Sequence, residues 1–187
     1  LAPWRDTSND IDLLLILSGT RTADVPGISA AGATPDSRRF TAVADAEVLV
    51  KGPGGRRIWP LPSLQAGISP ALISYTAIRL MGLDPSIIAV GLLQSPAFAH
   101  LCLEPLTFGP SNCISTGRAM SPQRAHSLWH RGYLIGRKLK RPLILAESVP
   151  GGTTTAQAVL TGLGLSVGDY ISGSALCPPT QLKKQLV

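Results

Sequence analysis

Residues 143–160, LILAESVPGGTTTAQAVL, combine an acid, two glycines and three threonines where an apolar run gives way to a helical pattern. The apolar run stops at Glu147. Small and hydroxylated residues then follow: Gly151, Gly152, Thr153, Thr154 and Thr155. A helix N-terminus presents unpaired N–H groups and partial positive charge, and glycines let the backbone approach an anion closely. These residue types therefore have the chemistry of a phosphate site.

Two interpretations of this segment compete on spacing alone. In the first, Thr153 is an ordinary N-cap and the glycines form a tight turn. In the second, the loop binds the single phosphate of a mononucleotide, while Glu147 binds ribose hydroxyls or positions a basic ring nitrogen. A Walker A loop is excluded because no lysine follows the glycines. Residues 162–168, GLGLSVG, miss the GxGxxG pattern because the last glycine comes one residue late.

Composition narrows the classes of protein to consider. The 187 residues suit one domain, 1–187, and 44% hydrophobic residues argue against disorder. The charge of +6 suits anionic ligands or nucleic acid. Nucleic-acid binding is the least favoured class because aromatics make up only 5% and the basic residues form no recognisable motif. We therefore expect a small-molecule site and no nucleic-acid partner.

Metal, disulfide and membrane signals are weak. Three cysteines without a CxxC pair indicate neither a disulfide framework nor a zinc site. His126 and His130 are four residues apart on an expected helix, but no nearby acid completes a metal motif, so we expect surface residues and no metal. Apolar runs fall well short of the roughly 20 residues that cross a bilayer. We expect a cytoplasmic protein with no membrane partner, and the initial Leu1 indicates that the natural start is missing.

Hydrophobic patterning predicts alternating strands and helices. We expect strands at 11–20, 46–52, 85–93, 142–146 and 169–175. We expect helices from Thr34–Pro35, over 69–82, over 121–141, over 153–164 and from 178 onward. Ile73, Ala77 and Leu80 should form one face of the helix at 69–82. Leu128, Ile135 and Leu139 should form one face of the helix at 121–141. Residues 94–120 should form a long surface excursion. The alternation indicates an α/β fold with a mainly parallel, Rossmann-like sheet flanked by helices, with ligands beyond the carboxyl ends of the strands.

Two stretches resemble a known enzyme family. AESVPGGTTTA, 146–156, resembles the Gly-Glu-Met-Gly-Ile-Gly-Asn-Thr-Thr-Thr-Ala loop of nicotinate-nucleotide–dimethylbenzimidazole phosphoribosyltransferases, without a gap. VPGISAAGATPDSRRFTAVADAE, 25–47, is similar to a cyanobacterial and archaeal branch of that family. The two stretches lie about a hundred residues apart in the order that the family shows. The resemblance covers what would be the N-terminal half of such a protein.

The resemblance implies a reaction. Phosphoribose would pass from nicotinate mononucleotide, the substrate, to dimethylbenzimidazole or a related base in cobamide lower-ligand synthesis, with no cofactor. Glu147 falls on the loop glutamate and would support catalysis, and Gly151 to Thr155 would bind the nucleotide. The family's general base belongs to its C-terminal part, so we expect this chain alone to be inactive. Two positions depart from the family loop, namely Gly152 in place of Asn and Val149 in place of Gly.

The 25–47 stretch leaves two interpretations open. Gly27, Gly32 and Arg38 would bind substrate if the loop serves the nucleotide, and an arginine opposing a helix dipole favours an anionic partner. Alternatively, the glycines let the loop pack on the sheet, and Arg38 is solvated. A noncatalytic mononucleotide-binding or regulatory module is the alternative for the whole chain. An apolar face left uncovered by a missing half would favour a homo-oligomer.

Overall fold

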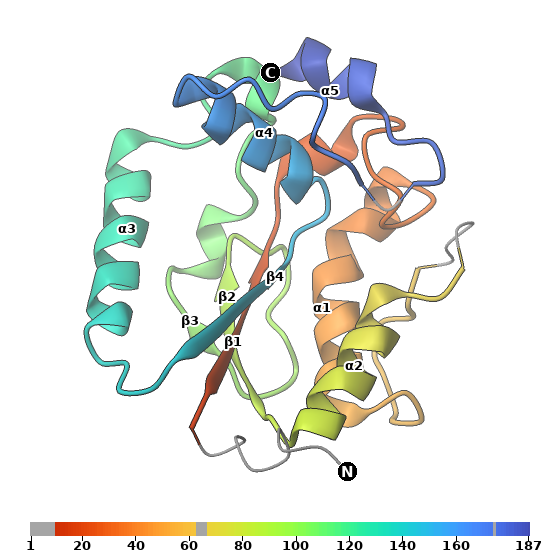
Figure 1. The fold of residues 1–187 in the computed structure, drawn as a ribbon, viewed down its shortest axis with the longest axis vertical. Helices are drawn as coiled ribbons and strands as arrows, with labels where there is room; N and C mark the ends of the chain where they lie inside the picture. The colour runs from red at the N-terminus through yellow and green to blue at the C-terminus, as the bar shows by residue number, and fades with distance from the viewer. Residues whose placement is uncertain (1–9, 63–66, 174) are drawn as a thin grey trace.

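The computed structural model describes residues 10–62, 67–173 and 175–187, and a four-stranded parallel sheet forms its centre (Figure 1). β1 (Asp12–Ser18) lies between β2 (Pro85–Val90) and β4 (Leu143–Ser148), and the short β3 (Leu101–Cys102) pairs with β2. All of these pairs are parallel, in the order β3-β2-β1-β4. The predicted α/β fold with a parallel sheet is confirmed.

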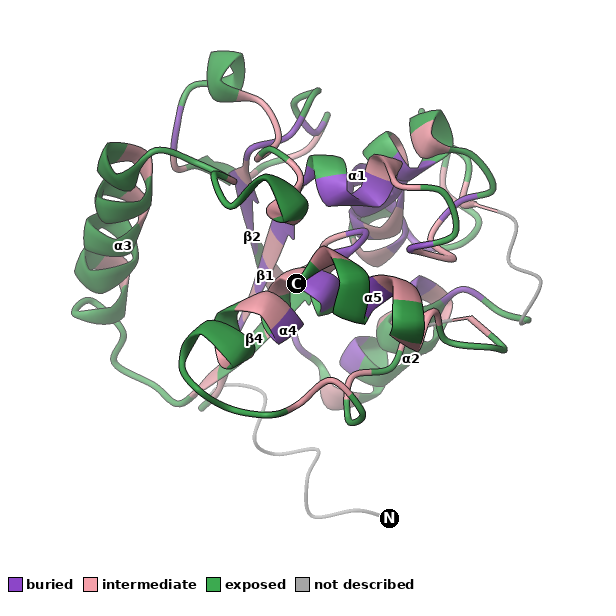
Figure 2. Ribbon diagram, turned by 90° about the horizontal axis from the view of Figure 1, so that it is seen from above, coloured by how far each residue is buried: buried purple, intermediate pink, exposed green. Residues whose placement is uncertain are grey.

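Helices lie on both faces of the sheet and above the carboxyl ends of its strands. α1 (Pro35–Lys51) and α2 (Pro70–Met81) lie on one side, and α3 (Pro122–Gly136) lies on the other (Figures 1 and 2). α4 (Gly152–Gly162) and α5 (Thr180–Leu186) lie above the carboxyl ends of the strands. Single-turn 3-10 helices also occur, at Arg21–Asp24, Leu106–Phe108 and Ile114–Thr116. None of the helices in the described part of the chain is long and apolar enough to span a bilayer.

The strand order contains one change of direction. The chain moves from β1 to β2 to β3 on one side and then returns to add β4 on the other side of β1. The loops that leave β1 and β4 therefore diverge at the carboxyl end of the sheet. In open α/β sheets such a switch point opens the crevice in which ligands bind.

The core lies between α1 and the sheet. Its buried side chains include Leu15 and Leu17 of β1, Val43 and Ala46 of α1, and Ile87 of β2. Small residues along α1 allow close packing, because a helix face rich in alanine approaches a sheet closely. α2 adds a smaller cluster below, in which the main contacts come from Leu13, Ile78 and Leu83.

α1 runs through the segment that we predicted to be a second strand at 46–52, so that prediction was wrong. Thr34 and Ser37 cap its start reciprocally, Pro35 occupies the first turn, and the helix continues to Gly52. Ala46 and Val48 are buried together with Ala42 one turn earlier. No turn signal separates 46–52 from the capped start, so helix propagation and burial outweigh the local β-propensity.

The predicted strand at 169–175 is also absent from its described residues, 169–173 and 175; residue 174 lies outside the described part. Tyr170 N donates to the Val167 carbonyl and closes a turn there, and the Ser172 carbonyl is taken by Lys183. These bonds use backbone groups that a strand would have offered to a neighbour.

Smaller corrections concern the helices. α2 buries Ala71 and Ile78, whereas Ile73 and Leu80 on the predicted face are exposed. Apolar residues occur all round α2, so their spacing alone does not select a face. α3 ends at Gly136 instead of 141, which leaves Leu139 outside it. The 94–120 excursion is mainly irregular, although it contains β3 and two 3-10 turns.

Candidate functional site

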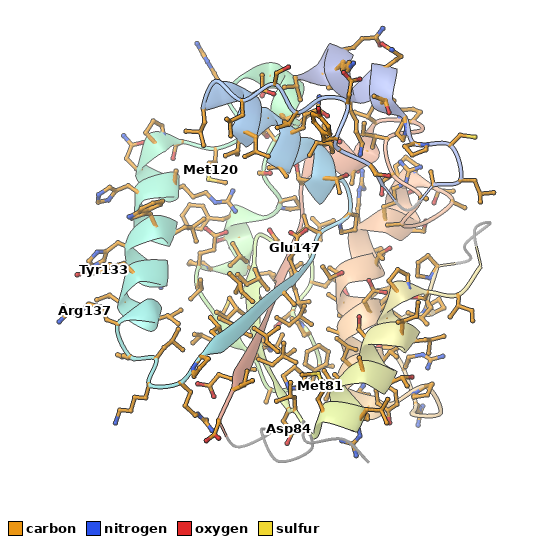
Figure 3. The ribbon with its side chains drawn as sticks, in the orientation of Figure 1. Met81, Asp84, Met120, Tyr133, Arg137 and Glu147 are labelled. Atoms are coloured by element: carbon orange, nitrogen blue, oxygen red, sulfur yellow. The ribbon has the colours of Figure 1, made fainter. Side chains whose placement is uncertain are left out.

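A cleft opens where the loops after β1 and β4 diverge, and it joins the two stretches singled out in the sequence. One wall is the loop at 28–31 together with Thr41 and Asp45 of α1. The other wall is the segment 147–153, which runs from the end of β4 into α4. Figure 3 shows Glu147 near the top of β4, below the start of α4. Segments that are about a hundred residues apart in the chain therefore share one cleft at the switch point.

The start of α4 differs from the capped helix that spacing favoured. Gly151, not Thr153, is the N-cap, and no side chain caps the helix. Gly151 has φ of 77°, and a β-carbon on it would lie 3.1 Å from the Ala23 nitrogen. Glycine is therefore required both by the left-handed backbone and by the close contact with the 3-10 turn after β1. The interpretation in which Thr153 is the N-cap is therefore wrong. No side-chain oxygen caps α4, and the N–H groups of Gly152 and Thr154 donate to the carbonyls of Val149 and Gly151.

Lys183 of α5 lies at the start of α4 and was not identified from the sequence. Its side chain is 1% exposed, and Nζ donates to Thr153 Oγ1 at 2.9 Å and to the Ser172 carbonyl. No carboxylate pairs with Lys183 within the described part of the chain. Burial lowers the pKa of Lys183, and a bound anion would raise it again. A buried amine without a counter-ion beside an uncapped helix start suits an anionic ligand.

Glu147 packs against the first residue of α4. A β-carbon on Gly152 would lie 3.2 Å from Glu147 Oε1 and 3.1 Å from the Val149 β-carbon. Glycine at this position leaves room for the carboxylate, whereas the asparagine of the resembling loop would have to displace it. The residue as a whole is exposed, but partial burial of its carboxyl group raises the pKa of Glu147.

Asp45 of α1 is the second acid of the cleft and was also not identified. Ser148 Oγ donates to Asp45 Oδ2 at 3.0 Å, which ties α1 to the end of β4. Burial raises the pKa of Asp45 to about 6, and the hydrogen bond from Ser148 opposes that rise. Asp45 lies within the 25–47 stretch, but an acid between alanines in a helix carries no motif of its own.

The other predicted site residues divide into two groups. Gly151, Gly152 and Thr153 line the cleft with Glu147. Thr154 is fully buried, its hydroxyl has no hydrogen-bond partner within the described residues, and neither Thr154 nor Thr155 is on the wall of the cleft.

Gly27, Gly32 and Arg38 shape the loop that forms the first wall. Arg38 is buried and donates to the carbonyls of Gly32, Ala23 and Val25, at 2.8–3.1 Å. A β-carbon on Gly32 would lie 2.6 Å from Ser37 Oγ, and one on Gly27 would contact Leu182 of α5. Arg38 thus holds the 23–32 loop by its backbone, and residues 28–31 between these contacts line the cleft.

Comparison with known proteins gives close relatives. No protein-family model matches the chain. The chain is 64% identical over its whole length to a UPF0284 protein of Prochlorococcus marinus (strain MIT 9313), and 55% identical over its whole length to one of Parasynechococcus marenigrum (strain WH8102). The chain belongs to the UPF0284 family. This UPF0284 chain spans about half the length of the curated relatives it matches, namely 46% and 48% of those two proteins.

A third relative, the UPF0284 protein of Prochlorococcus marinus (strain MIT 9301), is 44% identical over 95% of the chain, which covers 46% of that protein. The names of these UPF0284 proteins state no reaction. The chemistry of the cleft must therefore be argued from its geometry. Its walls carry two acids of raised pKa, a stretch of loop backbone and a helix start without a side-chain cap, and Lys183 lies buried behind Thr153 at that start. That set suits an anionic, hydroxylated ligand.

Proposed function

We propose that the cleft binds a mononucleotide, nicotinate mononucleotide, and that this UPF0284 chain supplies the nucleotide-binding half of a phosphoribosyltransferase site. The observation that carries the proposal is Lys183, a buried amine with no carboxylate partner in the described chain, bonded to Thr153 at the uncapped start of α4. Water and carbonyl groups alone stabilise a buried ammonium poorly, whereas a phosphate dianion would satisfy it. The acceptor would be dimethylbenzimidazole or a related base, as the loop resemblance implies.

The groups of the cleft suit the parts of such a nucleotide. The phosphate would receive hydrogen bonds from the backbone N–H and the hydroxyl of Thr153, and Lys183 Nζ, which lies behind Thr153, would add positive charge. Glu147, on β4 beside Gly152, would accept hydrogen bonds from the ribose hydroxyls. As nicotinate leaves, positive charge builds on the ribose, and the nearby acids would stabilise that charge.

A noncatalytic mononucleotide-binding module is the second candidate. It is favoured by the contacts at the start of α4, since Thr153 and Lys183 can hold a phosphate whether or not a transfer follows. Both candidates require nucleotide binding in the same cleft. They differ in whether the nucleotide and a benzimidazole together yield a phosphoribosylated base, which chromatography of the reaction mixture would detect.

The binding step is tested by a pair of adjacent lysines. Lys183→Met removes the buried amine, whereas Lys184→Met removes an exposed amine that pairs with Asp169. Charge-assisted hydrogen bonds to phosphate predict a dissociation constant for nicotinate mononucleotide about 10- to 100-fold higher in Lys183→Met, with little change in Lys184→Met. Calorimetric titration measures both, and circular dichroism checks that each variant folds. Equal losses of affinity in the two variants would show that only the net charge of the chain matters, which would contradict the proposal. Unchanged affinity in Lys183→Met would contradict it as well.

A further inference from the structure

We propose that Asp45 accepts the ring N–H of the acceptor base and takes its proton, with the base seated in the apolar groove between α2 and β4. This inference rests on the proposed function. It supplies from this chain a proton acceptor that the sequence alone did not reveal. It also assigns the groove to a planar azole ring.

The groove adjoins the cleft. Apolar side chains from β1, α1, α2 and β4 form its walls: Leu13, Leu15, Leu49, Ile78, Met81 and Ala146. Asp45, Glu147 and Ser148 line both the groove and the cleft. Met81 and Glu147 both line the groove, and Figure 3 shows Met81 lower than Glu147, toward the amino ends of the strands. An apolar channel therefore meets the nucleotide cleft at a carboxylate.

Asp45 has the geometry of a hydrogen-bond acceptor for a ligand. Ser148 donates to Oδ2 only, and no hydrogen bond to Oδ1 is present within the described residues. Asp45 and Glu147 are the only titratable groups that line the groove or the cleft in the described part of the chain. Glu147 packs against Gly152 at the start of α4, the phosphate end of the cleft. Asp45 is therefore the acid placed for the base.

These walls suit the kind of base that the loop resemblance implies. A planar apolar ring gains from burial in the groove, and one polar edge must face Asp45. A benzimidazole has this form: an apolar bicyclic body, one ring N–H and one ring nitrogen with a lone pair. A purely apolar ring would leave the carboxylate desolvated without a partner.

The proton and electron balance is simple. The lone pair of the unprotonated ring nitrogen attacks the anomeric carbon of the nucleotide, and the bond from that carbon to nicotinate breaks with its electron pair staying on nicotinate. The attacking ring would become cationic, and Asp45 takes the proton of the other ring nitrogen, so the product base is neutral. Burial raises the pKa of Asp45 to about 6, which suits a group that accepts and then releases a proton near neutrality.

A four-way comparison tests the role of Asp45. Benzimidazole and 1-methylbenzimidazole, which lacks the N–H, would be titrated into the chain saturated with nicotinate mononucleotide, for the wild type and Asp45→Asn. Asn keeps an oxygen for Ser148 Oγ, so the link between α1 and β4 is retained. The wild type should prefer benzimidazole by about tenfold or more, and Asp45→Asn should lose most of that preference. The wild-type preference should grow as the pH rises through about 6, because only ionised Asp45 accepts without competition.

Two controls separate failure of this inference from failure of the proposed function. Nicotinate mononucleotide should bind Asp45→Asn and the wild type with similar affinity, since the phosphate end lies at α4 and Lys183. If the nucleotide binds but Asp45→Asn keeps the full preference for benzimidazole, the role of Asp45 is wrong and the nucleotide site stands. Failure of the wild type to bind the nucleotide would instead contradict both the proposed function and the role of Asp45. An equal loss of both azoles in Asp45→Asn would also overturn the inference, because it would indicate a structural role.

Discussion

Asp45 lines the cleft and Lys183 lies buried behind Thr153, and neither residue has a sequence signal of its own. Lys183 lies 30 residues beyond its partner Thr153, in α5, and the residues KKQLV around it form no recognisable motif. Asp45 lies between two alanines of α1, 103 residues before its partner Ser148. Long-range contacts of this kind arise from packing, which spacing along the chain does not encode.

The raised pKa of Asp45 predicts a pH-dependent change in stability. Its carboxyl group has a pKa of about 6 when folded, against 3.8 as the ordinary value. An acid with a raised folded pKa loses stability as the pH rises from about 4 to about 6, because the unfolded chain releases the proton first. Asp45→Asn removes this loss, so it should be more stable than the wild type by about 3 kcal/mol at pH 8.

Urea unfolding at several pH values measures that difference, which should shrink as the pH falls and disappear below about pH 3. Glu147 also has a raised pKa, but it is present in both proteins and cancels from the comparison. A difference independent of pH would show that Asp45 is not desolvated as described.

The cleft residues that could be predicted from the sequence are those that belong to a local sequence pattern. Glu147, Gly151, Gly152 and Thr153 line the cleft, as their position between an apolar run and a helix indicated. The specific role of Thr153 as the cap was wrong, because the left-handed Gly151 starts α4 two residues earlier. The contact of Gly151 with Ala23 in the turn after β1 fixes that start, and no local rule reveals it.

At the scale of elements, the start of α4 depends on this one glycine. Gly151→Ala would strain the left-handed backbone and place a methyl group 3.1 Å from the Ala23 nitrogen. Gly164→Ala is the matched control, since φ is 84° there but nothing lies within 4 Å of the added carbon. We expect Gly164→Ala to lower the free energy of unfolding by about 1 kcal/mol, and Gly151→Ala by about 2 kcal/mol or more.

Thermal and urea unfolding of the two variants would measure these losses. If both glycine variants lose the same amount, the contact between the start of α4 and the turn after β1 carries no energy. A larger loss in Gly151→Ala supports the packing that holds the two walls of the cleft together.

Capping and turn signals predicted elements better than β-propensity did. Thr34–Pro35, Ser69–Pro70 and Ser121–Pro122 each start a helix as expected, because capping is chemistry between neighbours. β1, β2 and β4 follow their apolar runs. The predicted strands at 46–52 and 169–175 are wrong because tertiary contacts decide both segments. Residues of the first segment pack against β1 as part of a helix, and backbone groups of the second form a turn and bind Lys183.

At the scale of the whole molecule, large apolar side chains remain exposed on both sides of the sheet, among them Ile73 and Leu80 of α2 and several residues of α3 and β4. Leu145 of β4 is 63% exposed, and Trp129 and Tyr133 of α3 are 79% and 56% exposed. Figure 2 shows α3 mainly in the colour of exposed residues. α3 buries none of its residues and is tied to the excursion by the Arg124–Glu104 ion pair. Such surfaces favour association. The homo-oligomer that we expected from the sequence stays a prediction. The activity of the whole protein also stays a prediction, since the relatives are about twice as long as this chain.

The fold and the cleft belong together at this scale, because the cleft exists only where the order β3-β2-β1-β4 changes direction. The central claim is that this switch point binds a nucleotide by its phosphate. Calorimetric titration of the chain with nicotinate mononucleotide and with nicotinate riboside, which lacks only the phosphate, tests it most directly. We predict at least about a hundredfold tighter binding of the mononucleotide, from several charge-assisted hydrogen bonds at α4 and Lys183. Equal affinities, or binding of neither compound, would contradict the claim.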